Sequence, residues 1–402
     1  MASDCTEDDR LSEPSAPCDP LRAKEPSVCG KEPSFALYLH VPFCVAKCGY
    51  CSFYSRVTDE SAVEGWLAGV SREAGRLAAL WGGPLPLETA YVGGGTPSTL
   101  SLAVWKRLLH VLEDAFRFSE TVEATVEANP HSLTDGHLAL WRGFFTRVSL
   151  GVQSLQDGEL AWLGRRHGAD DALRALEKIL SRGFDASADL LFSLPAQTLR
   201  AWHDSLRRTA AAGAGHISTY QLTPEPGTPL GNAAPALPDG YPFYRFAQWY
   251  LERKGMEQYE IASFSLPGKE CRHNLAYWRQ GNVLGLGPSA WGYLDGFRYR
   301  NAPSLEEYVP ATEARFPAAG AERLEGRARG VEAAILALRT KWGVELAPFS
   351  ARFGQKLTDD LLEALRGVPP RLVRFEKASV RLTPPGMRVG NAIWSGLLSL
   401  AE

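Results

Sequence analysis

Three cysteines stand close together near the start of the chain, at Cys44, Cys48 and Cys51, a C-x3-C-x2-C spacing. Thiolates are soft ligands that suit iron–sulfur clusters, and a short loop with three of them can hold three irons of a four-iron cubane. The fourth iron then has no protein ligand and can bind a small molecule. Structural zinc would need a fourth ligand, for which His40 and Cys271 are candidates. The triplet therefore predicts a 4Fe–4S site, with zinc as the alternative.

The elements that must position this loop follow an alternating pattern. An apolar run rich in β-branched and aromatic residues, Phe35–Val41, predicts a strand directly before the cysteines. Later strands are expected at Glu88–Val92, Thr121–Ala128, Arg147–Val152, Phe184–Phe192 and His216–Leu222. Helices are expected between them at Glu60–Leu80, Ser101–Ala115, Leu133–Gly143, Asp170–Arg182 and Thr198–Ala212. This alternation predicts a parallel sheet with crossover helices.

Residues able to take part in chemistry stand at the ends of these strands. In parallel sheets the functional groups gather at the C-terminal ends of the strands. The residues at these ends are His40, Gly94, Glu127, Gln153, Asp189 and Gln221. We therefore expect one site at this end of the sheet, next to the cysteine loop.

Composition bounds the class of protein. The chain has 402 residues, 45% hydrophobic and 22% charged, as in soluble globular proteins. Its net charge of −3 argues against a nucleic-acid partner. No apolar run approaches the roughly 18 residues needed to cross a bilayer, so stable membrane insertion is not expected. The N-terminal segment has no secretory signal pattern, which favours a cytoplasmic location.

Cysteine usage agrees with a reducing compartment. An odd total of seven cysteines in a large chain does not suggest a disulfide framework. No specific role is expected for the widely spaced cysteines of the N-terminal tail, Cys5, Cys18 and Cys29.

The cysteine triplet after a first strand resembles the signature of the radical S-adenosylmethionine (SAM) superfamily. The run from Tyr38 to Cys44 is similar to the coproporphyrinogen III oxidase-like group, which also contains the branch of HemW heme chaperones. Further similar segments are Gly93–Pro97, Val126–Pro130, Ser149–Gln153, Leu163–His167, Asp189–Pro195 and Leu222–Glu225. The resemblance extends over nearly everything from Phe35 to Leu397.

The resemblance implies an α/β fold, a partial (β/α)6 barrel with a smaller α-rich and possibly winged-helix-like C-terminal domain. The expected parts are a disordered extension over 1–33, the barrel over 34–230, a barrel-covering segment over 231–320 and the HemN-type C-terminal domain over 321–402. The extension is acidic and rich in proline and serine, which is typical of disorder.

In the proteins that this chain resembles, the iron of the cluster that has no protein ligand binds SAM. The resemblance therefore implies which residues of this chain contact SAM. The glycine run can let the backbone approach SAM closely, and Arg165 can meet a carboxylate with a two-pronged hydrogen bond. Glu127 can accept a hydrogen bond from the amine or a ribose hydroxyl of SAM. The alternative is that Glu127 is a solvated or ion-paired carboxylate with no ligand. The SAM contacts implied are Tyr38, Tyr50, Gly94, Gly95, Thr96, Glu127, Gln153, Arg165 and Asp189. His40 belongs to the same motif, but we do not assign it as a ligand.

The segment from Cys271 to Trp278 resembles the HNxxYW motif of the chaperone branch, where it is associated with heme. Histidine is a common axial ligand of heme iron, so His273 is the candidate ligand. Tyr277 and Trp278 offer flat apolar surface for the macrocycle. The alternative is a buried histidine, hydrogen-bonded inside an aromatic-rich core.

The resemblance therefore implies a heme chaperone that holds heme and a SAM-liganded 4Fe–4S cluster and passes heme to an acceptor protein. It also allows a homodimer. The alternative is an oxygen-independent coproporphyrinogen III oxidase, which removes carboxyl groups from propionate side chains by radical chemistry. Phe53 favours the chaperone, because the oxidase typically has a further cysteine at this place.

Overall fold

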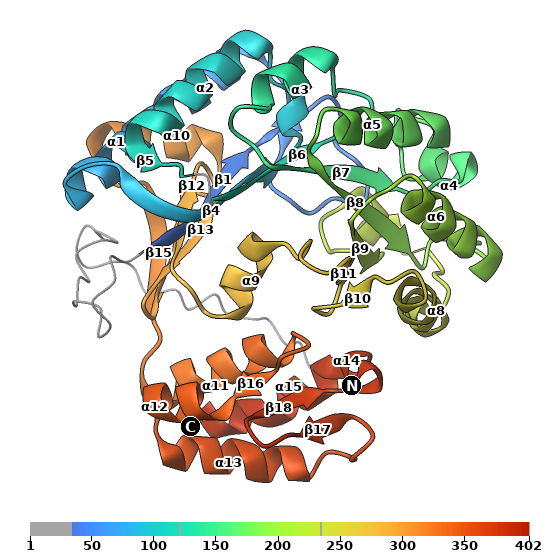
Figure 1. Ribbon diagram of the computed structural model, residues 1–402. Helices are drawn as coiled ribbons and strands as arrows, with labels where there is room; N and C mark the ends of the chain where they lie inside the picture. Colours follow the sequence, from blue (N-terminus) through green and yellow to red (C-terminus); the bar gives the residue numbers. More distant parts are fainter. Residues whose placement is uncertain (1–33, 120–121, 234, 402) are drawn as a thin grey trace, which may run out of the picture.

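The computed structural model describes residues 34–119, 122–233 and 235–401. The tail cysteines and the extension expected over 1–33 lie outside these residues. Within them the main feature is a sheet of 13 strands. Its central part consists of parallel strands, which curve so that helices cover the convex side (Figure 1).

Six parallel strands are those expected from the alternating pattern. In the sheet, each of them lies beside the previous one of the six in the sequence. They are β1 (Phe35–Val41), β4 (Leu85–Gly94), β6 (Glu123–Ala128), β7 (Arg147–Gln153), β8 (Asp185–Phe192) and β9 (His216–Gln221). The helices between them are α1 (Glu60–Trp81), α2 (Leu102–Ala115), α3 (Asp135–Trp141), α4 (Asp157–Trp162), α5 (Ala169–Ser181) and α6 (Leu199–Ala211). The sheet stays open, so the partial barrel is confirmed.

Capping residues explain where several of these helices begin. The side chain of Asp59 accepts a hydrogen bond from the backbone N–H of Ala62 at the start of α1. Ser101 and Thr198 cap α2 and α6 in the same way. Such caps satisfy backbone donors that have no partner within the helix, and each contributes about 1 kcal/mol. The short helix α4 was not predicted.

The two faces of the parallel strands differ in polarity, because side chains alternate along a strand. Residues such as Leu37, Val92 and Val126 point to the helices and join a continuous apolar core. The residues between them, such as Tyr91 and Glu127, point into the curve of the sheet and are largely polar. The barrel interior is therefore available for polar ligands, while its outside provides the stability.

Strands from the second half of the chain extend the sheet at both edges. β12 (Val283–Leu286) pairs in parallel with β1, and antiparallel strands continue from it. These are β13 (Trp291–Leu294), β14 (Phe297–Asn301) and β15 (Ala318–Arg323). At the opposite edge, β11 (Ser263–Ser265) and β10 (Glu257–Gln258) follow β9. The sequence pattern did not predict these strands.

A buried carboxylate attaches this extension to the first helix. Glu73 of α1 accepts hydrogen bonds from the backbone N–H of Gly287 at 3.0 Å, from Tyr308 Oη at 2.5 Å and from Asn301 Nδ2 at 2.7 Å. Tyr308 lies on α10 (Leu305–Ala314). One side chain thus joins α1, the loop after β12, β14 and α10.

The C-terminal part has a second hydrophobic core of its own. Its elements are α11 (Gly326–Leu338), β16 (Val344–Glu345), α12 (Leu346–Phe353), α13 (Gln355–Arg366), β17 (Val373–Phe375), β18 (Ser379–Leu382), α14 (Pro384–Met387), α15 (Gly390–Leu397) and η2 (Leu398–Ala401). The three short strands form one antiparallel sheet. A helix, a strand, two helices and two strands in this order give the winged-helix-like arrangement expected.

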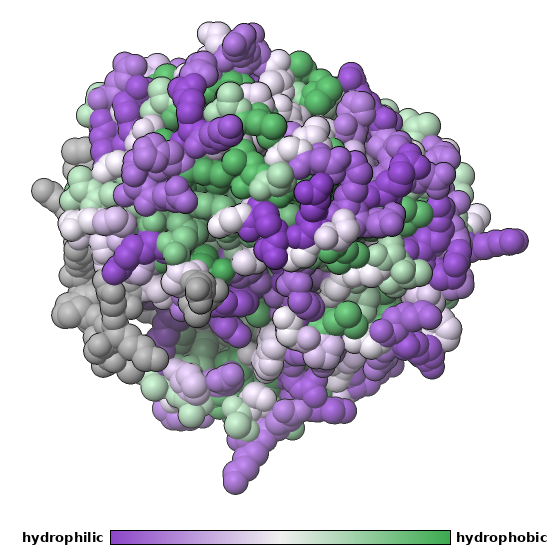
Figure 2. Space-filling view, turned by 45° about the horizontal axis from the view of Figure 1, so that its top comes forward, coloured by the Kyte–Doolittle hydropathy of each residue, from purple (hydrophilic) through white to green (hydrophobic). Residues whose placement is uncertain are grey.

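One helix lies between the two cores. This is α9 (Arg272–Trp278), which carries the HNxxYW segment and sits inside the curve of the sheet, above the C-terminal part (Figure 1). The remaining elements are β2 (Phe43–Cys44), β3 (Arg56–Val57), η1 (Pro97–Thr99), β5 (Phe116–Arg117), α7 (Pro229–Ala233) and α8 (Gly240–Glu252). Among the described residues no helix is long and apolar enough to span a membrane. Figure 2 shows a face on which polar side chains predominate, with apolar ones in smaller groups between them.

Candidate functional site

A cavity of about 560 Å³ opens where the parallel strands end. All three cysteines of the triplet line it, together with residues from the ends of β4, β6, β7, β8 and β9. The structure places Gly94, Glu127, Gln153, Asp189 and Gln221 on the same cavity as the cysteine loop. His40 is the exception and does not line the cavity.

The cysteine loop is held against its surroundings by short contacts. Cys44 Sγ lies 3.5 Å from Thr96 Oγ1, and Cys48 Sγ lies 3.7 Å from Arg165 Nη1. The backbone N–H of Cys51 donates to the carbonyl of Cys48. Burial raises the pKa of the Cys44 and Cys51 thiols.

The donor set suits a cubane better than a single metal ion. All three thiols are free, partly exposed and directed to the same cavity. A cubane cluster needs this arrangement, because it takes one thiolate on each of three irons. Among the described residues, no three His, Cys, Asp or Glu side chains are grouped to hold a metal ion.

Neither candidate for the fourth zinc ligand lies at this loop. His40 Nε2 is 2.8 Å from the carbonyl of Tyr54, and its Nδ1 is 3.0 Å from Tyr38 Oη, so both ring nitrogens are in use. Cys271 is buried at the N-terminus of α9, away from the cavity lining.

The glycine run forms a tight cradle beside the cysteines. A Cβ on Gly93 would meet Glu127 Cδ at 2.7 Å, and one on Gly95 would meet the carbonyl oxygen of Phe43 at 2.6 Å. Gly94 has a φ of +113°, a backbone conformation that favours glycine. The cradle is closely packed against Glu127 and Phe43, and the backbone of Gly94 and Gly95 lines the cavity without side chains in the way of a ligand.

Two partly buried carboxyl groups face the cavity from neighbouring parts of the sheet. Glu127 accepts from Tyr91 Oη at 2.8 Å and from the backbone N–H of Gly94 at 3.0 Å. Asp189 accepts from Ser149 Oγ at 3.3 Å. Burial raises the pKa of Glu127 to about 7 and that of Asp189 to about 6. An incoming cation would offset this desolvation, so the pair suits a positively charged ligand.

Arg165 and Gln153 complete the cavity on the side of β7. Arg165 Nη2 donates to the carbonyl of Gly151 at 2.9 Å, and its buried Nε has no partner among the described residues. Gln153 has a φ of +66° at a register shift of β7, a strained conformation for a residue with a side chain. A guanidinium with an unused donor, on the same cavity as two carboxyls, can orient a zwitterionic ligand.

The SAM contacts expected from sequence line this cavity with the exception of Tyr38; Tyr50, Gly95 and Thr96 are among the lining residues. Tyr38 instead hydrogen-bonds to His40 and stacks on Tyr91, with ring centroids 6.2 Å apart.

Sequence reasoning missed other lining residues, notably Tyr91, Asn129, His131, Ser149 and Tyr220. The strand period of two could have found some of them. Ser149 precedes Gly151 and Gln153 by two and four residues on the same strand, and Gly151 and Gln153 both line the cavity, so the period of two points to Ser149.

His273 lies deeper in the barrel than the cavity. Its Nδ1 is 2.9 Å from Thr89 Oγ1, and its ring stacks on Tyr91 at 5.1 Å, with Tyr277 edge-on at 5.3 Å. The imidazole is 1% exposed, and its Nε2 has no partner among the described residues. Burial lowers the pKa of His273 to about 3, so the ring is neutral at physiological pH.

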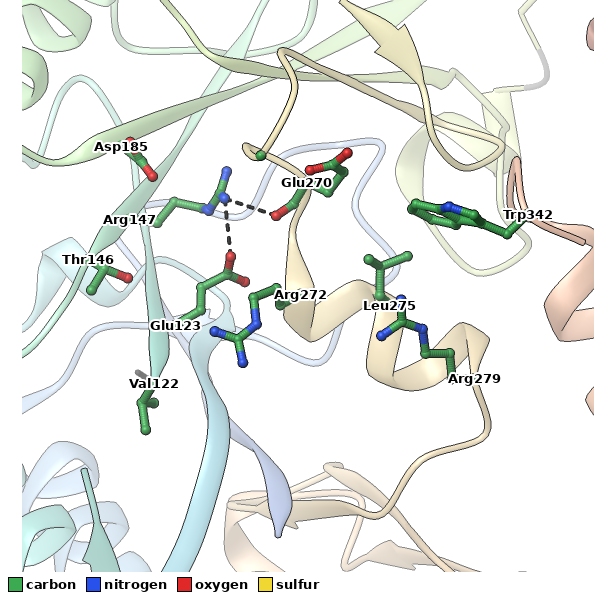
Figure 3. Close-up of a pocket in the computed structure, with 11 residues that line it drawn as sticks. Val122, Glu123, Thr146, Arg147, Asp185, Glu270, Arg272, Leu275, Arg279 and Trp342 are labelled. Atoms are coloured by element: carbon green, nitrogen blue, oxygen red, sulfur yellow. Dashed lines mark hydrogen bonds and ion pairs between the residues drawn. The ribbon is translucent and has the colours of Figure 1, made fainter. Parts of the chain in front are cut away.

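The opposite face of α9 borders a second cavity, of about 490 Å³, near the start of β6, β7 and β8. Figure 3 shows Arg272 and Leu275 of α9 and the adjoining Arg279 on one side of it, with Trp342 of the C-terminal part nearby. Arg147 Nη2 donates to Glu123 and to the carbonyl of Glu270, both at 3.2 Å. Charged groups of both signs line this cavity, and His273 points away from it into the barrel.

The Radical SAM superfamily profile matches residues 38–209, and the HemN C-terminal domain profile matches residues 324–389. The heme chaperone HemW of Bacillus subtilis (strain 168) is 31% identical over 373 residues, which cover 90% of this chain and 98% of that protein. HemW of Mycobacterium tuberculosis (strain H37Rv) is 34% identical, covering 82% of this chain and 88% of that protein. This chain belongs to the HemW family of radical SAM proteins. In this HemW-family chain, the region that matches the superfamily profile runs from β1 to α6. It therefore includes the cysteine loop and the glycine cradle.

A solved structure supports the same fold. Coproporphyrinogen III oxidase (HemN) from Escherichia coli superposes on this HemW-family chain with a TM-score of 0.81 at 21% identity, covering 91% of this chain and 90% of that one. At this identity the similarity establishes the architecture alone.

Proposed function

We propose that this chain is a heme chaperone, which binds heme and passes it to an acceptor protein. The observation that carries the proposal is the similarity to HemW chaperones over nearly the whole chain, together with the unpartnered Nε2 of His273 on the segment that matches their HNxxYW motif. The proposed setting is the cytoplasm, and a homodimer is the proposed assembly.

In this proposal Cys44, Cys48 and Cys51 hold a 4Fe–4S cluster, whose open iron binds SAM. The three free thiols on one cavity support this ligand set. When bound, the cluster can supply one electron to SAM and so generate a radical.

The chain's own groups bind and orient SAM. Gly94, Gly95 and Thr96 let it approach β4, Glu127 and Asp189 receive its positive groups, and Arg165 receives its carboxylate. Tyr50 and Gln153 belong to the same lining. Tyr38 is proposed only as a support, through its contacts with His40 and Tyr91.

His273 is the proposed protein ligand of heme iron. A neutral imidazole with one nitrogen fixed by Thr89 and the other unpartnered has the donor chemistry of an axial ligand. The surroundings of His273 are too closed for a macrocycle in this structure, because its imidazole is 1% exposed and is stacked on Tyr91. Heme binding at this atom therefore requires Tyr91 or α9 to move.

The test is a heme titration of the full chain, followed by its absorption spectrum, beside an anaerobic assay for coproporphyrinogen III decarboxylation. We expect stoichiometric heme binding that His273→Ala weakens at least about tenfold, with the cluster absorption unchanged. His216→Ala is the matched control, since His216 is also buried, with one ring nitrogen unpartnered.

The decarboxylation assay contains SAM and reductant, and release of 5′-deoxyadenosine shows that the cluster is competent. We expect no decarboxylated porphyrinogen. Its appearance would establish the oxidase alternative, and heme binding that is equal in the wild type and His273→Ala would remove His273 as the ligand.

A further inference from the structure

One arginine of the main cavity contacts the cysteine loop. Arg165 Nη1 lies 3.7 Å from Cys48 Sγ, within the range of a hydrogen bond to sulfur. The positive charge of Arg165 also acts on Cys44: burial raises the pKa of that thiol, and Arg165 partly offsets the rise. One guanidinium therefore acts on two of the three proposed cluster ligands.

Strand β7 fixes this guanidinium in place. Arg165 Nη2 donates to the carbonyl of Gly151 at 2.9 Å. Two residues later, His167 Nε2 lies 3.2 Å from the carbonyl of Val152, the next residue of the same strand. The segment that follows α4 is thus attached to β7 at two points, so a rigid element sets the position of Nη1 beside Cys48.

The charge of Arg165 has no partner of opposite sign. Arg165 forms no salt bridge with the described residues, although Glu127 and Asp189 line the same cavity. The side chain is half-buried, and a charge taken out of water is costly unless an opposite charge lies nearby. Thiolates that hold a metal cluster supply such a charge. The position and the sign of Arg165 therefore suit a negatively charged group on the cysteine loop.

We propose that Arg165 raises the reduction potential of the cluster held by the triplet, through its positive charge and its N–H group at Cys48. The inference rests on the proposed 4Fe–4S site. Net charge and hydrogen bonds to the sulfurs are among the factors that set the potential of iron–sulfur clusters. Reduction adds one negative charge, so a fixed cation stabilises the reduced state more than the oxidised state. Removal of Arg165 therefore makes the cluster harder to reduce.

The test is an anaerobic redox titration of the full chain with its cluster reconstituted and dithionite as the reductant. Electron paramagnetic resonance measures the amount of reduced cluster at each potential. SAM is left out, because Arg165 is also a proposed SAM contact. Arg165→Gln removes the charge, and we expect its equilibrium constant for reduction to fall at least about tenfold, a potential lower by about 59 mV for one electron.

Two further variants make the result specific. Arg166→Gln is the matched control, since Arg166 also lines the cavity but is exposed and forms no hydrogen bond to a cysteine among the described residues. Salt screens an exposed charge, so the equilibrium constant of this control should stay within about twofold of the wild type. Arg165→Lys keeps the charge but loses the planar donor group, so its potential should lie between those of the wild type and Arg165→Gln.

The outcomes separate the inference from the site on which it rests. Equal potentials in the wild type and Arg165→Gln, or an equal drop in Arg166→Gln, would refute the role of Arg165 and leave the ligand set intact. A potential of Arg165→Lys equal to that of Arg165→Gln would refute the part played by the charge. If Arg165→Gln assembles no cluster, Arg165→Lys decides: a potential below that of the wild type supports the proposal, and an equal one refutes it. If the wild type itself assembles no cluster, the proposed 4Fe–4S site fails.

Discussion

At the scale of residues, the two carboxyl groups of the main cavity dominate its electrostatics. Glu127 and Asp189 lie in one cavity and form no salt bridge with the described residues, and burial is the main reason for their raised pKa values. Each carboxyl binds a proton near neutrality more readily than a solvated one does. A ligand with positive charge must displace such protons, which makes its affinity depend on pH.

We predict that SAM affinity rises as the pH increases from 6 to 8. The pKa of Glu127 is about 7 and that of Asp189 about 6, so protonation at pH 6 removes negative charge, and ionisation at pH 8 restores it. Equilibrium dialysis at constant ionic strength measures the effect. Glu127→Gln should lose most of the pH dependence, whereas Glu159→Gln, at a carboxyl outside the cavity lining, should keep it. A flat profile in the wild type would contradict the prediction.

We predict that Cys48→Ala abolishes the broad visible absorption of a reconstituted iron–sulfur cluster, because two thiolates on the loop cannot hold the cubane. Bound iron and absorption measured together check this. Cys271→Ala is the control and should retain both, since Cys271 is buried at α9 and does not line the cavity. Survival of colour and iron in Cys48→Ala would show that the ligand set is wrong.

At the scale of elements, the strand extension depends on the buried Glu73. Three donors, from Gly287, Asn301 and Tyr308, converge on its two oxygens. All three residues are buried, so bulk solvent does not reach these donors. The side chain therefore fixes how α1, β14 and α10 are arranged around β12.

We predict that Glu73→Ala lowers the free energy of unfolding by about 3 kcal/mol or more, since leaving one buried hydrogen-bonding group unpaired costs about 1–3 kcal/mol. Glu73→Gln should be milder, because its amide oxygen still accepts hydrogen bonds. Urea denaturation followed by circular dichroism measures both. Equal stability of Glu73→Ala and the wild type would show that the donors find other partners.

The elements also show what the sequence could reveal. The six parallel strands β1, β4, β6, β7, β8 and β9 were predictable, because short runs of strand-forming residues alternate with helical patterns along the chain, and both are local signals. The strands β12 to β15 are short, and β12 contains Gly285; their pairing depends on β1, which is distant in sequence. The cysteine loop and Glu127 were found from motif and strand position. The enclosure of His273 was not, because stacking on Tyr91 is a tertiary contact that no local pattern encodes.

At the scale of the whole molecule, one arginine joins the HNxxYW helix to the C-terminal core. The guanidinium of Arg339 lies between the rings of Trp278 and Trp394, at 4.6 and 4.7 Å from their centroids. Trp278 ends α9, and Trp394 belongs to α15. The planar cation thus adds to the other links between the two parts, such as the hydrogen bond from the backbone N–H of Lys341 to the carbonyl of Tyr259.

We predict that Arg339→Ala lowers the melting temperature of the C-terminal core and separates its unfolding from that of the barrel. A desolvated cation–π contact contributes about 2 kcal/mol, and two are lost. Differential scanning calorimetry should show two transitions in place of one. The control Arg374→Ala changes an exposed arginine of the same core and should melt like the wild type. A single unshifted transition in Arg339→Ala would contradict the bridge.

The pairing of β1 with β12 has a consequence for synthesis on the ribosome. Ala36 pairs with Val283, so one edge of the first strand waits for a partner that is made much later. At typical translation rates this delay is on the order of ten seconds or more. During that time the nascent barrel presents an apolar strand with unsatisfied backbone groups, which other chains can join. Slow codons or cold before residue 283 should therefore lower the soluble yield, even though the finished fold is unchanged.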